Sequence, residues 1–82
     1  MLDFLKEQRK IANAYWTAHR HDFDETIKAE VSASAKVGRT TAYVYVQGQL
    51  NGEIVERRVT ELGCRVIKSG NNWSWYWVQF EY

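Results

Sequence analysis

The chain has 82 residues, of which 45% are hydrophobic and 26% charged, so it fits one small globular domain with a marginal core and is too apolar to be disordered. Its formal net charge of +1 lacks the basic excess of a typical nucleic-acid-binding protein. Cys64 is the only cysteine, which excludes an intramolecular disulfide and a cysteine-based zinc site.

Residues 2 to about 20 have the apolar spacing of a helix. Phe4, Ile11 and Tyr15 recur on one face. The charges within MLDFLKEQRK replace the apolar stretch of a signal peptide, and no apolar run approaches the roughly 20 residues that cross a membrane. We therefore expect a cytoplasmic protein without a membrane segment. Residues 1–22 are either part of the core or, as an extra amphipathic helix, a means of homo-oligomerisation.

A second helix is predicted from about residue 23 to 37. Asp22 is a suitable N-cap, Glu25 can complete a capping box with it, and Gly38 is placed to end the helix. A single bent helix over both segments is the alternative. In KVGRTT, Arg39 follows this glycine, where a turn can present N–H groups to a phosphate. A helix C-terminus disfavours an anion, however, so an ordinary cap is the stronger interpretation.

The sequence HRHD at 19 to 22 is a candidate for metal or acid–base chemistry. His19 and His21 are two residues apart and diverge by about 200° on a helix, which disfavours a shared metal. A hydrolase would use His21 as a base oriented by Asp24 or Glu25, but no serine or cysteine nucleophile is tied to them by spacing. We therefore expect a non-enzymatic protein that holds neither a metal nor a cofactor.

Residues 40–47, TTAYVYVQ, predict a strand because β-branched and aromatic side chains alternate along them. The next stretch is ambiguous. Asn51 and Gly52 form a strong hairpin signal, whereas the apolar residues of 53–62 recur at helical spacing and Gly63 can end a helix. We favour the helix. The alternative is a return strand, which would give a four-stranded sheet.

Two more strands are predicted at residues 64–68 and 73–81, with a polar turn, SGNN, at 69–72. A strand–helix–strand unit favours parallel strands, so the last strand can lie between the other two and antiparallel to both. A central strand is apolar on both faces, as WSWYWVQF is. The prediction is an α+β fold with two N-terminal helices followed by β-α-β-β, a three-stranded sheet and the aromatic C-terminal strand in its centre.

One face of the predicted sheet has no helix to cover it. The side chains expected to face the helices are Val44, Val46, Val78 and Phe80. The opposite face then carries Tyr43, Tyr45, Trp73, Trp75 and Trp77. An exposed aromatic patch of this size requires a partner. Arg39 and Arg65 add cations that suit stacked bases and their phosphates, the alternative being a solvated charged surface.

The region from Thr26 to Tyr82 contains an ordered set of motifs. A helix leads through IKAEVSASAKVGRTTAYVYV into a strand, EIVERRVTELGCRV follows, and a polar turn precedes WSWYWVQFEY. This order resembles a loose group of small phage-encoded proteins, in which a helix ending Leu-x-x-Gly-Tyr-x-Val precedes a C-terminal strand of Trp, Ile and Ser. Cys64 stands where the group usually has tyrosine. The resemblance covers about two-thirds of the chain.

This resemblance implies a setting rather than a site, because the group supplies no binding residues to transfer. It implies a phage-encoded accessory protein in the cytoplasm of a host cell. Some phage proteins of this size inhibit host defence by blocking a host protein or sequestering a nucleotide signal, often as oligomers. We therefore expect a homo-oligomeric inhibitor that binds through the aromatic sheet face. The alternative is an accessory protein that binds single-stranded nucleic acid on that face.

Overall fold

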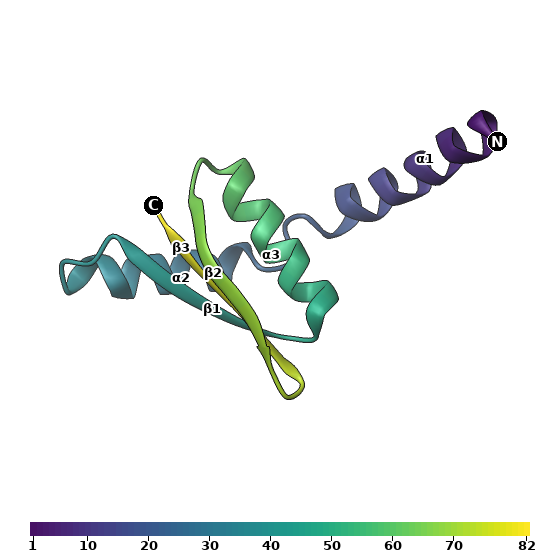
Figure 1. Cartoon of the computed structure of the whole chain (residues 1–82). Coiled ribbons are helices and arrows are strands. Elements are labelled where there is room, and N and C mark those ends of the chain that lie inside the picture. The colour runs from purple at the N-terminus through teal and green to yellow at the C-terminus, as the bar shows by residue number, and fades with distance from the viewer.

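Helices and strands follow one another along the chain in the order that their apolar periodicities predict. The computed structural model describes all 82 residues and contains, in order, α1 (Leu2–His19), α2 (Asp24–Lys36), β1 (Thr41–Gln47), α3 (Gln49–Glu61), β2 (Arg65–Asn72) and β3 (Trp75–Glu81) (Figure 1). The predicted α+β class and the order of elements are confirmed. Residues 20–23 form a turn, so the first two helices are separate.

Helices α2 and α3 end in the same way, at a glycine with a positive φ. After α2, the N–H of Gly38 (φ 79°) donates to the carbonyl of Ala35, and the N–H of Arg39 donates to that of Ser34. After α3, the N–H of Gly63 (φ 89°) donates to the carbonyl of Thr60. Glycine adopts this conformation without a Cβ clash. The predicted role of Gly38 is confirmed.

The start of α2 differs from the prediction. Phe23 is the N-cap, and no side chain caps the helix. The carboxylate of Asp22 instead accepts from Nδ1 of His19 at 2.7 Å, so the predicted capping box with Glu25 is wrong. The reason is that the chain is still turning at residue 22, which leaves its carboxylate closer to the end of α1 than to the first turn of α2.

The ambiguous stretch is helical. Helix α3 begins at Gln49, two residues before Asn51, so the Asn51–Gly52 pair lies within its first turn and the hairpin alternative is wrong. Gly52 is buried there against β3. A glycine that permits a close approach between a helix and a sheet looks, in the sequence, like a glycine that permits a turn.

The sheet has the strand order β1-β3-β2, and β3 is antiparallel to both of its neighbours, as predicted. The predicted turn at residues 69–72 is wrong. Those residues extend β2, where Ser69 pairs with Val78 and Asn72 pairs with Trp75, and the turn is Trp73–Ser74 instead. Pairing with the apolar central strand therefore outweighs the turn-forming composition of residues 69–72.

Helices α2 and α3 cover one face of the sheet and create the core. The buried apolar residues there are Ile27, Ala42, Val44, Val46, Val55, Val59, Val78 and Phe80. The predicted inward-facing residues of β1 and β3 are thus confirmed. None of the helices combines the length and the apolar character that crossing a bilayer requires.

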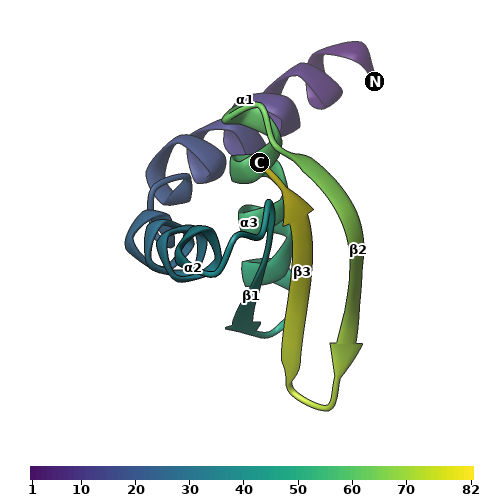
Figure 2. The ribbon, with the colours of Figure 1, turned by 90° about the vertical axis from the view of Figure 1, so that its left-hand side faces the viewer.

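Helix α1 projects from this body, with the N-terminus at its far end (Figure 1). It has no buried residue, and the whole chain measures 52 × 28 × 20 Å. Figure 2 shows β2 and β3 as a long hairpin, with the helices to one side of the strands. The opposite face of the sheet therefore has no helix of its own chain over it.

Candidate functional site

The open face is the side of the sheet that faces away from α2 and α3. Side chains alternate between the faces of a strand, so every second residue of β1 and β3 belongs to it, whereas the register of β2 shifts between Val66 and Lys68. Across the sheet, in the order β1, β3, β2, its rows are Thr41, Glu81 and Arg65; Tyr43, Gln79 and Lys68; Tyr45, Trp77 and Gly70; and Gln47, Trp75 and Asn72. Charges lie at one end of the face and aromatic rings at the other.

The aromatic cluster consists of Tyr43, Tyr45, Trp75 and Trp77, from two neighbouring strands. The rings of Tyr43 and Tyr45 are stacked with 6.4 Å between centroids, and Tyr43 and Trp77 are 6.3 Å apart at 52°. Tyr45 is 59% exposed and Trp75 is 50% exposed. The cluster is therefore an ordered set of rings that presents much of its surface to solvent.

Gly70 of β2 positions the last member of this cluster. The Trp77 ring lies over it, so a Cβ atom at residue 70 would be 3.1 Å from Cζ2 of the indole. The absence of a side chain at residue 70 therefore leaves room for the indole beside the outer strand. Near the hairpin end, Tyr45, Trp75 and Asn72 line a hollow of about 380 Å³.

The structure separates Trp73 from the other aromatic residues. The sequence predicted it on the open face with Trp75 and Trp77, which is wrong. Trp73 lies in the two-residue turn of the β2–β3 hairpin, with φ 62° and 97% of its surface exposed. The error has the same cause as the misplaced turn, since β2 is longer and β3 begins later than predicted.

The two arginines chosen from the sequence do not form one anion clamp. Arg65 lies on the open face and donates to Glu81 at 3.2 Å. Arg39 precedes β1 and, with Tyr43, lines a hollow of about 220 Å³ at the α2–β1 edge. Arg39 precedes β1 and Arg65 is on β2, and the central strand β3, with the carboxylate of Glu81, lies between β1 and β2. Lys68 is the one cation of this face without an ion pair.

The backbone around Gly38 is also committed to the fold. The N–H groups of residues 38 and 39 donate to the last carbonyls of α2, and the carbonyl of Arg39 accepts from the Tyr82 hydroxyl at 2.7 Å. A phosphate would find no free backbone donor at these two residues. The interpretation of KVGRTT as an ordinary helix end is therefore the one that the geometry supports.

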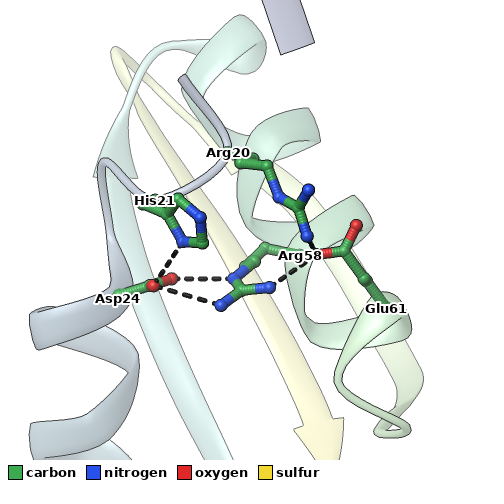
Figure 3. A network of polar contacts seen from close by, with 5 residues as sticks. All are labelled: Arg20, His21, Asp24, Arg58 and Glu61. Carbon is green, nitrogen blue, oxygen red and sulfur yellow. Dashed lines mark hydrogen bonds and ion pairs between the residues drawn. The ribbon is translucent and has the colours of Figure 1, made fainter. Parts of the chain in front are cut away.

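A polar network, which sequence reasoning missed, joins the α1–α2 junction to α3 (Figure 3). Arg58 donates from Nε and Nη2 to the carboxylate of Asp24 at 2.9 and 3.2 Å. Arg58 and Arg20 both donate to Glu61. Only 13% of the Arg58 side chain is exposed, so a mostly enclosed guanidinium has two carboxylate partners. Asp24 and Arg58 are 34 residues apart, and no local pattern marks such a pair.

The network shifts the pKa values of its members. Hydrogen bonds from the Arg58 guanidinium lower the pKa of Asp24, and the neighbouring His21, 2.8 Å away, adds to this effect. The Asp24 carboxylate in turn raises the pKa of Arg58. Partial burial opposes the effect at Glu61, but hydrogen bonds from Arg58 and Arg20 still lower its pKa. These shifts are typical of an ion-pair network that holds the α1–α2 junction against α3.

The histidines of HRHD point to different carboxylates. His19 contacts Asp22, and His21 contacts Asp24, whose main partner is Arg58. Nowhere in the chain do three or more His, Cys, Asp or Glu side chains gather closely enough to hold a metal ion. The His21–Asp24 pair is accordingly part of the network at the junction.

Helix α1 touches the body only near its C-terminal end. The guanidinium of Arg57, on α3, lies 4.3 Å from the ring centroid of Trp16. Ala12, Tyr15 and Trp16 face Leu50 and Ile54 of α3 across a groove of about 130 Å³.

No family model, curated protein or solved structure matches the chain.

Proposed function

We propose that the protein is a non-enzymatic binding protein that covers part of a host protein with its open sheet face. The observation that carries this proposal is the aromatic cluster on a face that no helix of the chain covers. Aromatic rings held by a rigid sheet supply large contact areas at low conformational cost, and tryptophan and tyrosine are enriched among the residues that dominate protein interfaces.

The distribution of charge favours a protein surface over a phosphate-bearing ligand. Arg65 is already paired with Glu81, and Arg39 lies at the edge of the sheet. The unpaired cations near the rings are then Lys68 on the face and Arg39 beside Tyr43 at its edge. Phosphate contacts supply most of the affinity for nucleic acids, and two separate cations provide little of it. An apolar partner surface instead requires the largely uncharged cluster that is present.

The inhibitory role follows from the phage-type resemblance of the sequence. A protein that only binds can act by blocking a surface that its partner needs, and an inhibitor of host defence would work in this way. This setting and the host target are part of the proposal. They predict that inhibition and binding depend on the same residues, namely Tyr45, Trp75 and Trp77.

Single-stranded nucleic acid is the second candidate ligand. The observation in its favour is that several rings lie on an open antiparallel sheet beside Lys68, an arrangement on which bases can stack. A nucleotide signal would use the same rings. Both ligands predict quenching of tryptophan fluorescence, and the oligonucleotide predicts a strong dependence on salt.

Site-specific photocrosslinking in host cells tests the proposal. A photoreactive phenylalanine analogue at Tyr45 or Trp75 should form an adduct with one and the same host protein. The control is the analogue at Lys28, an exposed residue of α2, which should not form that adduct. Trp77→Ala should remove the adduct formed at Tyr45.

Titration of the purified chain with oligonucleotides of mixed sequence and with nucleotides completes the test. The proposal predicts that neither probe quenches the fluorescence of Trp75 and Trp77. Quenching that Tyr45→Ala and Trp75→Ala abolish would instead favour the second candidate. Equal crosslinking from Tyr45 and Lys28 would refute a specific role for the open face.

A further inference from the structure

Helix α1 has an apolar stripe that its own chain leaves largely exposed. Its members are the exposed large apolar side chains of Phe4, Leu5, Ile11 and Tyr15, and Ile11 is 62% exposed. The charged residues Asp3, Lys6, Glu7, Arg9 and Lys10 lie outside the stripe by their spacing. Most of the stability of a helix in a protein comes from packing of its apolar face, and α1 buries no residue within its own chain.

The stripe continues into the groove between α1 and α3. At its C-terminal half, Tyr15 and Trp16 form one wall, and Leu50 and Ile54 of α3 form the other. Leu50 is itself exposed. The N-terminal half of the stripe, with Phe4 and Leu5, has no such wall beside it. One end of α1 therefore has apolar side chains without a groove, and the other end has a groove without an occupant.

We infer that α1 pairs in antiparallel orientation with α1 of a second copy of the chain, so that each N-terminal half enters the other's groove. Phe4, Gln8, Ile11 and Tyr15 follow one another at intervals of four, three and four residues, which is the spacing of a coiled-coil seam. In the antiparallel pair, Phe4 lies opposite Tyr15 of the partner subunit, and Gln8 lies opposite Ile11 of the partner subunit.

Antiparallel pairing explains both halves of α1 at once. It places Phe4 and Leu5 of each chain beside Trp16 of the partner subunit, at the mouth of the α1–α3 groove. A parallel pair would stack Gln8 on its own copy and leave both grooves empty. A two-fold axis makes the contact isologous and closes it at two copies.

Because Asp3 and Glu7 are interspersed with the basic residues, the polar side of α1 also lacks the cationic character of a membrane-surface helix.

The size of the contact sets the expected affinity. A fully covered aromatic side chain buries about 150–250 Å². The half-exposed stripe and Leu50 then supply on the order of 500 Å² per copy, below the roughly 800 Å² per partner of a standard interface. We therefore expect a dimer that dissociates in the micromolar range. The open sheet face takes no part in it, so this inference is independent of the proposed function.

Sedimentation velocity and light scattering of the full chain at about 5–500 µM test the pairing, because this range brackets a micromolar interface. Wild type should approach twice its monomer mass of 9.7 kDa. Ile11→Glu puts a charge in the stripe and should raise the dissociation constant at least about tenfold. The matched control is Asn13→Glu, on the opposite side of α1, which should dimerise like wild type. Neither position is buried, so both variants should keep the thermal transition of the core.

Disulfide trapping tests the orientation in a Cys64→Ser background. Phe4→Cys combined with Tyr15→Cys should give a covalent dimer, whereas Phe4→Cys alone should not. Crosslinking by Phe4→Cys alone would overturn the antiparallel arrangement. A wild type that stays monomeric throughout the range, or equal effects of Ile11→Glu and Asn13→Glu, would overturn the pairing. Dissociation by Tyr45→Ser, on the open face, would assign the interface to the sheet instead.

Discussion

The ring of Tyr76 lies directly over Gly52, where a Cβ atom would stand 2.0 Å from Cδ1 of the ring. The Tyr76 hydroxyl donates to Glu56 at 3.0 Å and lies 3.3 Å from the hydroxyl of Ser69. A central strand, a helix and an outer strand thus meet at one phenol. The position of α3 on the sheet depends on the absence of a side chain at residue 52.

Gly52→Ala should destabilise the protein by about 1–2 kcal/mol. Alanine favours a helix by about 1 kcal/mol over glycine, but the displaced ring and its hydrogen bonds cost more. Urea denaturation measures the difference. In a Tyr76→Ala background the same change should become stabilising, because only the helix propensity remains. A destabilisation of equal size in both backgrounds would show that the ring is not the cause.

Trp73→Gly should stabilise the chain by about 1 kcal/mol. Trp73 adopts φ 62° in the hairpin turn, which glycine adopts without a Cβ clash, and its side chain is 97% exposed and has almost no packing to lose. Trp73→Ala keeps the positive φ and serves as the control, with an expected change within about 0.5 kcal/mol. Thermal unfolding of the three proteins should rank the glycine variant highest. A glycine variant below wild type would mean that Trp73 contributes more than its exposure indicates.

Asp24→Asn should remove part of the protein's stability near neutral pH, by about 1–2 kcal/mol, because Arg58 loses an ionic partner while mostly enclosed. The lowered pKa of Asp24 means that the carboxylate stabilises the fold above its unfolded pKa of about 4, and that this contribution fades as the pH falls through and below that value. The variant should therefore lose less stability than wild type between about pH 5 and pH 3.

Urea unfolding at a series of pH values measures this dependence. Glu25→Gln is the matched control, since Glu25 lies in the same first turn of α2 without an ion pair. It should retain the wild-type dependence on pH. Parallel stability curves for wild type and Asp24→Asn would exclude the Arg58 pair as a source of acid sensitivity.

Truncation of two neighbouring residues of β1 should reduce the stability to different extents. Val44 is fully buried beneath the helices, so Val44→Ala should cost about 2 kcal/mol in the free energy of unfolding. Tyr45 points to the open face, and Tyr45→Ala should cost less than about 1 kcal/mol. Chemical denaturation of both variants tests which face is the core. A larger loss from Tyr45→Ala would indicate that the open face is covered in solution.

Much of the fold could be predicted from the sequence because its signals are local. The alternation in β1 indicated that Val44 and Val46 would face the core, and the apolar run of β3 indicated a central strand. The helical spacing of 53–62 correctly outweighed Asn51–Gly52. These signals suffice where each residue's environment is determined by the periodicity of its own segment.

The errors arose where contacts with distant segments of the chain determine the local structure. Residues 69–72 have the composition of a turn, but their pairing with β3 makes them strand, and Trp73 then takes a turn position that a bulky residue rarely occupies. The Asp24–Arg58 pair joins α2 to α3 across 34 residues. The site was therefore predictable only in part. Four of the five predicted aromatic residues share the open face, and the fifth, Trp73, lies in the turn that the sequence misplaced.

The protein has two parts that differ in stability, helix α1 and the body formed by the sheet with α2 and α3. The body unfolds only when the core beneath α2 and α3 is exposed, whereas α1 of a single, unpaired chain has no buried side chain whose loss would resist its fraying. A small chain is ordinarily described by one free energy of unfolding. Here circular dichroism, which registers the helix of residues 2–19, should begin to change before the fluorescence of the tryptophans on β3 does. Backbone amides of α1 should likewise exchange with solvent faster than those of β3.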